Sequence, residues 1–208
     1  MKQADRRGRG RPRVAGTAEA LEAAMRVFWA EGFAAASIDM LTRAMRMPRA
    51  SLYQRHGGKE GLFLAAVAHY VDSRFAPLIA RLDAGGTLAA DLGGFFAAVI
   101  RHATADPATL GCLVSCVLAD AAGANPVMQA ELARRFDSVE AVIAARLARA
   151  QAAGELAPGA DIATLAGMLA AIARGLMLRA RAGATPAALS PIAALAVQAA
   201  CGAAAAGA

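Results

Sequence analysis

The chain has 208 residues, a formal net charge of +6 and a hydrophobic fraction of 58%. That length allows one large or two small domains, three cysteines are too few for a disulfide scaffold, and the charged N-terminus lacks the apolar core of a signal peptide. Residues 182–208 carry no charged side chain, but proline, glycine and glutamine dilute their apolarity, so we expect a buried helix there and no membrane span. These features predict a cytoplasmic protein.

The positive charge is concentrated in the N-terminal part. Residues 1–60 contain twelve Lys/Arg and six Asp/Glu, whereas residues 61–208 contain ten of each sign. A basic module joined to a neutral one suggests that the first part meets a polyanion. Residues 1–13, MKQADRRGRGRPR, cannot bury a core and are expected to form a basic flexible arm.

Three helices are predicted after this arm. The first spans residues 18–31 and ends at Gly32. In the second, apolar residues recur at helical spacing up to Met45, and Ser37 stands where an N-cap belongs. Pro48 interrupts this helix but is well tolerated at the start of another, so we expect a third helix over residues 48–56.

The third helix has a polar outer face. Leu52 and His56 point one way along it. The rest of its surface offers hydroxyls, an amide, a guanidinium group and one tyrosine ring, from Arg49, Ala50, Ser51, Tyr53 and Gln54. Such a helix, held by a helix-turn-helix scaffold, fits the major groove of DNA.

Further helices are predicted throughout the remainder. They cover residues 59–82, with a kink or split at Pro77, and then residues 87–104, 108–122, 126–153, 161–181 and 190–201. No alternating strand pattern or hairpin turn signal is evident, so the sequence predicts an all-α protein of about nine helices.

The N-terminal motifs resemble the DNA-binding domain of the TetR/AcrR family, the tetracycline-repressor-like transcriptional regulators. The resemblance rests on the runs GRPR (10–13), RVFWAEGF (26–33), ASIDMLTRA (36–44), SLY (51–53) and GGKEGLF (57–63). It implies a helix-turn-helix domain over residues 14–60 and a helical ligand-binding and dimerisation domain over residues 61–208. Two positions depart from the family pattern: Arg46 replaces the usual turn glycine, and His56 replaces an aromatic residue.

The resemblance also implies which residues meet DNA. Ser37, Ser51, Tyr53 and Lys59 are expected to contact phosphates, which suits their hydroxyl and ammonium donors. Arg49, Ala50 and Gln54 are the candidates for base edges, since arginine reads guanine, glutamine reads adenine and alanine can touch a thymine methyl group. The alternative is that all seven are ordinary surface residues.

Cysteines stand in the middle of the chain. The run GCLV (111–114) is similar to a sub-group of the family in which a cysteine lies near the ligand pocket. Cys112 and Cys116 are one helical turn apart and could sense an oxidant or electrophile, or ligate a metal with His102. Their apolar neighbours favour simple packing, because free cysteine is commonly a small buried hydrophobe.

Two further sets of residues are predicted from the expected helices. Residues that could line an effector pocket, and that serve equally well as core, are Phe95, Phe96, Ile100, Cys112, Cys116, Met128, Phe136, Met168 and Met177. A stripe expected to form the dimer interface consists of Ile162, Leu165, Leu169, Ile172 and Leu176.

The sequence as a whole therefore predicts a homodimeric repressor that binds a double-stranded DNA operator and is released by a small-molecule effector. The alternative on the same fold is a redox or electrophile sensor acting through Cys112. A helical enzyme or ligand carrier is disfavoured, because no Ser/His/Asp set, metal-ligand spacing or phosphate-binding glycine loop is evident. We expect no cofactor and no metal. Sequence-independent DNA compaction would suit the arm but not the neutral C-terminal part.

Overall fold

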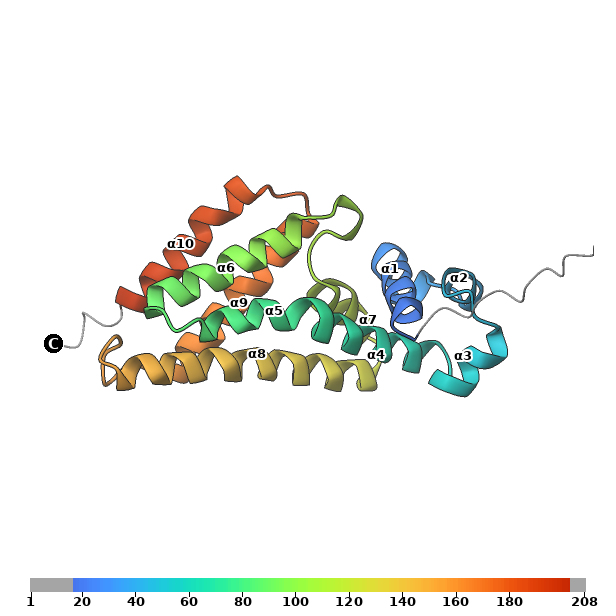
Figure 1. Cartoon of the computed structure of the whole chain (residues 1–208), viewed down its shortest axis with the longest axis horizontal. Helices are drawn as coiled ribbons and strands as arrows, with labels where there is room; N and C mark the ends of the chain where they lie inside the picture. The colour runs from blue at the N-terminus through green and yellow to red at the C-terminus, as the bar shows by residue number, and fades with distance from the viewer. Residues whose placement is uncertain (1–16, 203–208) are drawn as a thin grey trace, which may run out of the picture.

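The computed structural model describes residues 17–202, so the basic arm predicted at residues 1–13 lies outside the described part. The described residues are helical, as predicted, and contain no strand. Helices α1 to α3 form a small group at one end, and the longer helices run along the rest of the molecule (Figure 1). The α-helices are α1 (Thr17–Ala35), α2 (Ile38–Ala44), α3 (Arg49–His56), α4 (Lys59–Tyr70), α5 (Ala76–Ile79), α6 (Leu88–Thr104), α7 (Ala119–Ala122), α8 (Pro126–Ala152), α9 (Ile162–Arg181) and α10 (Pro186–Gly202).

The local signals for the first three helices are confirmed. Gly32 takes a non-helical conformation inside α1 (φ 77°), so the predicted stop appears as a kink. The Ser37 side chain accepts a hydrogen bond from the Met40 backbone N–H at 3.2 Å and so caps α2. Pro48 is the N-cap of α3, which ends at Gly57 in a left-handed conformation.

One long helical rod connects the two ends of the molecule. It comprises α4, a π-helical turn (Val71–Phe75), α5 and a final 3-10 turn (Ala80–Asp83). The expected disturbance at Pro77 takes the form of that π-helical turn, which ends two residues before the proline. A π-helical turn alters the i→i−4 ladder locally, which suits a residue that has no backbone N–H.

The single helix predicted over residues 108–122 is wrong. A short 3-10 turn (Pro107–Thr109) is followed by extended residues and then by a π-helical segment (Leu113–Leu118) that leads into α7. Gly111 adopts φ 87°, and a Cβ atom there would lie 3.0 Å from the Met177 carbonyl oxygen and 3.1 Å from Cys116 Sγ. The segment bends because only glycine fits so close to α9 with this backbone conformation.

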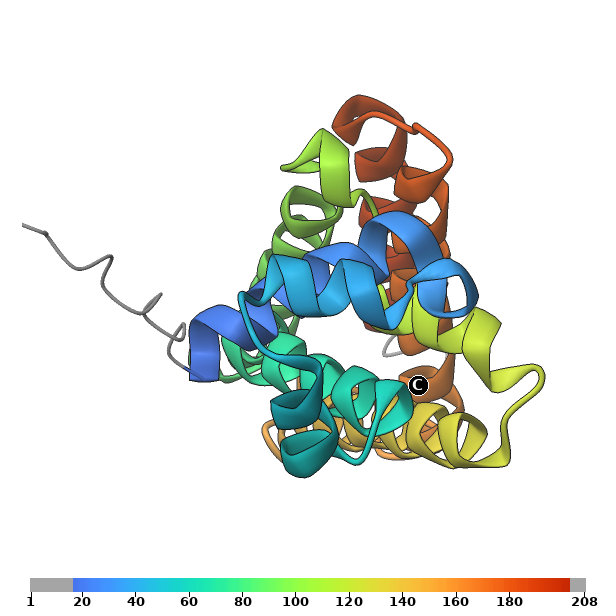
Figure 2. The same cartoon turned by 90° about the vertical axis from the view of Figure 1, so that its right-hand side faces the viewer.

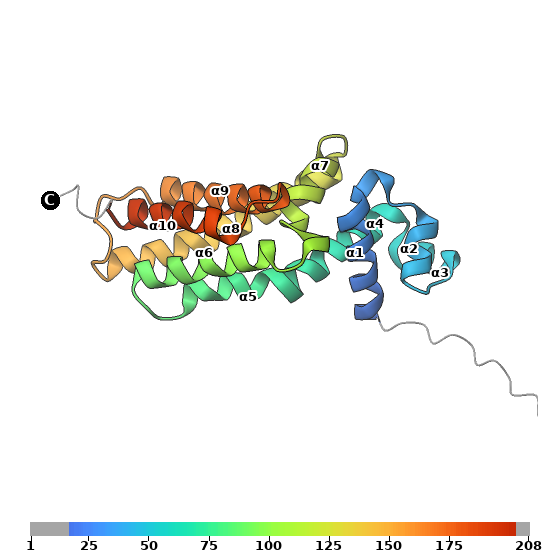
Figure 3. The same cartoon turned by 90° about the horizontal axis from the view of Figure 1, so that it is seen from above.

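The C-terminal helices form an elongated bundle. Helices α6 and α8 pack against the rod, α9 packs against α6 and α8, and α10 packs against α6 and α9. The first three helices sit across one end of this bundle (Figures 1 and 3). The same end, seen face-on in Figure 2, shows α1 crossing in front of the bundle. By length and hydropathy alone, Lys59–Asp83 and Ile162–Arg181 could cross a membrane. In each segment 33% of the most apolar stretch is buried inside the structure, and Phe63 and Leu169 are fully buried.

Two of the five residues predicted as a dimer interface need correction, and the other three stay a prediction. Leu169 and Leu176 are buried within the chain itself, with 0% and 2% exposure. Neither can contact a partner, because the apolar spacing of α9 reflects packing inside the protomer. Ile162, Leu165 and Ile172 are only partly buried, and they pack against the core of the same chain.

Candidate nucleic-acid interface and ligand cavity

The three-helix end has its own aromatic centre. Phe63 of α4 lies 4.8 Å from the Phe28 ring and 5.0 Å from the Phe33 ring, measured between centroids. Leu41 and Leu52 are fully buried beside them. This packing fixes the orientation of α2 and α3, so the outward side chains of α3 are held in a defined arrangement.

Helix α3 presents its predicted outer face to solvent. Arg49, Ala50 and Gln54 are exposed, Tyr53 is 45% exposed, and Ser51 is partly buried. Leu52 points inward as predicted, while His56 is partly buried at the end of the helix, where burial and the neighbouring Arg55 lower its pKa. The six candidate residues from Ser37 to Gln54 therefore lie on the surface or at its edge.

Two basic candidates already have partners. Arg49 lies 3.7 Å from the Asp39 carboxylate, and its guanidinium carbon is 5.9 Å from the centre of the Tyr53 ring. Both groups are exposed, so this ion pair is weak and DNA can displace it. Lys59 instead donates to the Ala34 carbonyl at 2.9 Å and lies 4.8 Å from the Phe33 ring, and burial lowers its pKa.

The Lys59 ammonium therefore joins the end of α1 to the start of α4. No pattern in the sequence indicates this contact, which joins residues 25 positions apart. The remaining N–H donors of the ammonium group still lie at the N-terminus of α4, where an anion is favoured. The predicted phosphate contact stays a prediction.

The turn before α3 and the turn after it both depend on special backbone geometry. Arg46 adopts φ 50°, so this arginine takes the left-handed conformation for which family members use glycine. After α3 the chain approaches α4 very closely: a Cβ atom on Gly61 would lie 1.9 Å from the His56 carbonyl oxygen. Within the GGKEGLF run, Gly61 is therefore required for the close packing of α4 against the end of α3.

A mainly apolar cavity of about 240 Å³ lies in the bundle. Its walls come from the rod, the segment after Gly111, α8 and α9. The polar groups among them are the Cys112 thiol, two serine hydroxyls and two guanidinium groups. The lining residues are Val71, Phe75, Ala76, Ile79, Cys112, Val114, Ser115, Arg135, Phe136, Ser138, Val139, Val142, Ala170, Ala173, Arg174 and Met177.

Three of the nine residues predicted for an effector pocket line this cavity: Cys112, Phe136 and Met177. The other six, Phe95, Phe96, Ile100, Cys116, Met128 and Met168, do not line it. Phe95 and Phe96 of α6 and Met128 of α8 are fully buried core residues, because their helices turn them toward other helices. The missed lining residues come from four distant segments, and no local spacing in the sequence links them.

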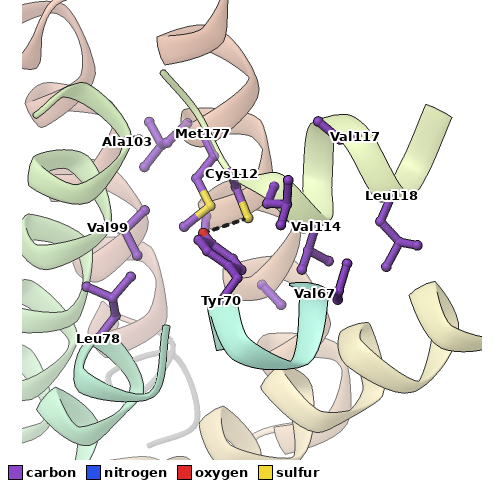
Figure 4. Packing of buried hydrophobic residues seen from close by; sticks show 14 of the residues in the cluster. Val67, Tyr70, Leu78, Val99, Ala103, Cys112, Val114, Val117, Leu118 and Met177 are labelled. Atoms are coloured by element: carbon purple, nitrogen blue, oxygen red, sulfur yellow. Dashed lines mark hydrogen bonds between the residues drawn. The ribbon is translucent and has the colours of Figure 1, made fainter. Parts of the chain in front are cut away.

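A buried polar cluster adjoins the cavity. The Tyr70 hydroxyl lies 2.8 Å from His102 Nε2. It donates a hydrogen bond to Cys112 Sγ at 3.3 Å (Figure 4). Burial, with Arg74 adding a smaller effect, lowers the His102 pKa to about 4, so the imidazole is neutral near pH 7. Burial and the nearby Cys112 raise the Tyr70 pKa well above its usual value. Cys116 remains a thiol, since burial raises its pKa.

Two contacts join the neighbourhood of the cavity to α1. Arg74, in the π-helical turn whose Val71 and Phe75 line the cavity, forms an ion pair with Glu22 of α1. On the other side, the Trp29 indole N–H donates to the Leu110 carbonyl at 3.2 Å. These two contacts link the surroundings of the cavity to α1, which packs against α2 and α4.

Comparison with known proteins defines the class of the chain. The family described as "Bacterial regulatory proteins, tetR family" matches residues 20–66, and the "Tetracyclin repressor-like, C-terminal domain" family matches residues 89–195. These two segments coincide with the three-helix end and the bundle. The chain belongs to the TetR family of transcriptional regulators.

Particular relatives agree with this assignment. The chain is 30% identical over 184 residues to the HTH-type transcriptional repressor ComR of Escherichia coli, covering 88% of each chain. A cysteine-substituted form of the TetR-family regulator CifR, solved in complex with a 26-base-pair operator, shares 30% identity and a TM-score of 0.82, covering 91% of this chain and 99% of that one. YezE of Bacillus subtilis, described as an uncharacterised regulator, is 31% identical over 162 residues, which cover 76% of this chain and 81% of YezE.

Proposed function

We propose that the protein is a homodimeric, cytoplasmic repressor that binds a two-fold symmetric operator and leaves it when a small molecule occupies the cavity. The observation that carries this proposal is the exposed face of α3, where Arg49 and Gln54 can enter a groove beside the Tyr53 hydroxyl. The relatives ComR and CifR support it, one being a repressor and the other an operator-binding regulator. No catalytic role is part of the proposal.

The dimer is proposed to form through the outer faces of α9 and α10. The exposed positions of α9 at helical spacing are Ala171, Gly175 and Leu178, the last with 56% exposure. Those of α10 include Pro191 and Leu195, which is 66% exposed. Large exposed leucines among small, uncharged residues are typical of an interface between close-packed helices.

Release is proposed to work through the contacts between the cavity and α1. A ligand that presses on Val71 and Phe75 displaces the π-helical turn, and Arg74 is on the same turn as these two residues. Loss of the Arg74–Glu22 pair frees α1 to tilt, which alters the separation of the two α3 helices in the dimer. A ligand acts in this way only to the extent that it binds the released form more tightly.

Selection of binding sites from random double-stranded DNA tests operator recognition. We expect the selected sites to be near-palindromic, with half-sites separated by about one helical turn or more. Sedimentation of a Leu178→Glu, Leu195→Glu variant tests the dimer, and we expect monomers that bind the selected site poorly. A tight dimer in this variant, or selected sites without two-fold symmetry, would refute the corresponding part of the proposal.

A second candidate function, electrophile sensing, is favoured by the position of Cys112. Its thiol lines the cavity and accepts a hydrogen bond from the Tyr70 hydroxyl, so an electrophile that enters the cavity meets this sulfur. An alkylator such as N-ethylmaleimide would add the sulfur across its double bond, the thiol proton ending on the neighbouring carbon. The electrophile-sensing function is supported if treatment with the alkylator abolishes operator binding in the natural protein and in Cys201→Ser, but not in Cys112→Ser. Equal loss in all three would exclude it.

A further inference from the structure

We propose that the cavity takes an amphipathic anion, a small molecule with an apolar body and a carboxylate that binds Arg174. This inference rests on the proposed function, because it names the chemical class of the effector for the same cavity. Among the described residues, the cavity lining contains two arginines and no acidic side chain. Most of the remaining wall is aliphatic or aromatic, which suits an apolar body.

Arg174 is held in position to meet such a group. Its guanidinium carbon lies 4.0 Å from the centre of the Phe136 ring, and both side chains line the cavity. This stacking fixes the plane of the guanidinium group, which is the geometry that a carboxylate can engage through two hydrogen bonds. The apolar wall and the anion-binding group therefore meet at one place.

The present partner of Arg174 leaves room for a ligand. Arg174 donates a single hydrogen bond, from Nη2 to Glu140 Oε1 at 2.5 Å, out of the five N–H donors that an arginine has. The Glu140 side chain is 38% exposed and does not line the cavity. Water can therefore solvate the Glu140 carboxylate if a ligand carboxylate takes its place.

The second arginine reinforces the positive potential of this wall. Arg135 and Arg134 both donate hydrogen bonds to the Glu131 carboxylate. Arg134 donates three of these four bonds, and Arg135 donates one. One carboxylate thus serves two guanidinium groups. Because Arg135 is only 14% exposed, its charge acts in a poorly solvated environment, where it attracts an anion more strongly than a surface charge would.

The test is direct binding of three probes with the same eight-carbon chain to the full-length protein without DNA: octanoate, 1-octanol and protonated octylamine. We expect octanoate to bind about tenfold more tightly than octanol or better, the size expected of charge-assisted hydrogen bonds, and octylamine to bind most weakly. Equal binding of octanoate and octanol, a preference for octylamine, or binding of none of the three would overturn the proposal.

Variants assign the preference to Arg174. In Arg174→Gln the affinity for octanoate should fall close to the affinity for octanol, so that their ratio is near one, while the octanol affinity itself changes little. In Glu140→Gln, which removes the competing carboxylate and keeps the arginine, octanoate should bind more tightly. Arg101→Gln is the matched control, because Arg101 is exposed on α6 and does not line the cavity, and it should keep the ratio of the natural protein. A ratio that survives in Arg174→Gln, or octanoate affinity that does not rise in Glu140→Gln, contradicts the assignment.

Operator binding is measured separately in the presence of octanoate. Octanoate binding without operator release would support the site described here and count against the ligand-released part of the proposed function. Failure of octanoate to bind, with normal operator recognition, would overturn this inference alone.

Discussion

The three-helix end and the cavity-bearing bundle hold their polar side chains in different ways. On α3, Arg49 and Tyr53 are exposed and interact only with near neighbours, so they are available to another molecule. Around the cavity, Arg174 and Tyr70 are held by partners from distant segments. In the proposed function, the outward side chains of α3 form the DNA-reading surface, called the reading surface below, and the cavity contains pairs that an incoming ligand would exchange.

Rigidity of the reading surface depends most on the close approach of α3 and α4. Gly61→Ala places a methyl group against the His56 carbonyl oxygen, so we expect a loss of about 3 kcal/mol or more in stability and loss of operator binding. Urea denaturation measures the first effect.

A matched glycine in the bundle shows whether the effect is local. Gly94 lies inside α6, and a Cβ atom added there would meet no neighbouring helix within 4 Å, so Gly94→Ala should keep stability or raise it by up to about 1 kcal/mol. Similar losses of stability in Gly61→Ala and Gly94→Ala would mean that the α3–α4 contact has no special role.

In the bundle, the largest expected effect is a dependence of stability on pH. Native His102 has a pKa of about 4, whereas in the unfolded chain its pKa is about 6.5. Acidification between these values protonates the unfolded chain first, so His102 should lower stability by up to about 3 kcal/mol as the pH falls from about 6.5 to about 4.

Urea denaturation across this pH range, compared between the natural protein and His102→Gln, measures the contribution. Glutamine keeps a group that can hydrogen-bond to the Tyr70 hydroxyl but does not titrate, so the variant should lose less stability on acidification. Parallel pH profiles for the two proteins would show that His102 is not held neutral in the fold.

On the reading surface, substitutions of two neighbouring side chains should have different consequences. Arg49→Ala is expected to relax discrimination at one base position by about 1–3 kcal/mol, because an arginine contact to a base edge carries sequence information. Tyr53→Phe should weaken binding to every sequence by a similar factor, since its hydroxyl is expected to touch phosphate. Affinities for a panel of single-base operator variants distinguish these results, and the same change of preference in both proteins would contradict the assigned roles.

The smallest expected effect on stability comes from a substitution in the turn before α3. Arg46 occupies a left-handed conformation, so Arg46→Gly should stabilise the protein by about 1 kcal/mol. Arg46→Ala removes the same charge but retains the backbone strain, and it should not stabilise. A melting temperature that rises equally in both variants would show that charge, not backbone conformation, is responsible.

The reading surface could be predicted from the sequence, because its determinants are local. Ser37 caps α2, Pro48 starts α3 and Leu52 faces inward through spacings of a few residues. The cavity could not be predicted in the same way. Phe75, Arg135 and Arg174 come together only through tertiary packing, and Phe95 or Met128 are equally good pocket candidates by residue type. The bend at Gly111 also depends on contact with α9, which lies more than sixty residues further along the chain.

The coupling of the two regions is tested most directly by filling the cavity without a ligand. Val142→Phe introduces a ring into the cavity from α8, and Val127→Phe, at an exposed position of the same helix, is the control. Operator affinity by fluorescence anisotropy should fall about tenfold or more in Val142→Phe, the size of a typical coupling energy, and stay unchanged in Val127→Phe. A folded Val142→Phe protein that binds the operator as tightly as the natural protein would contradict the account.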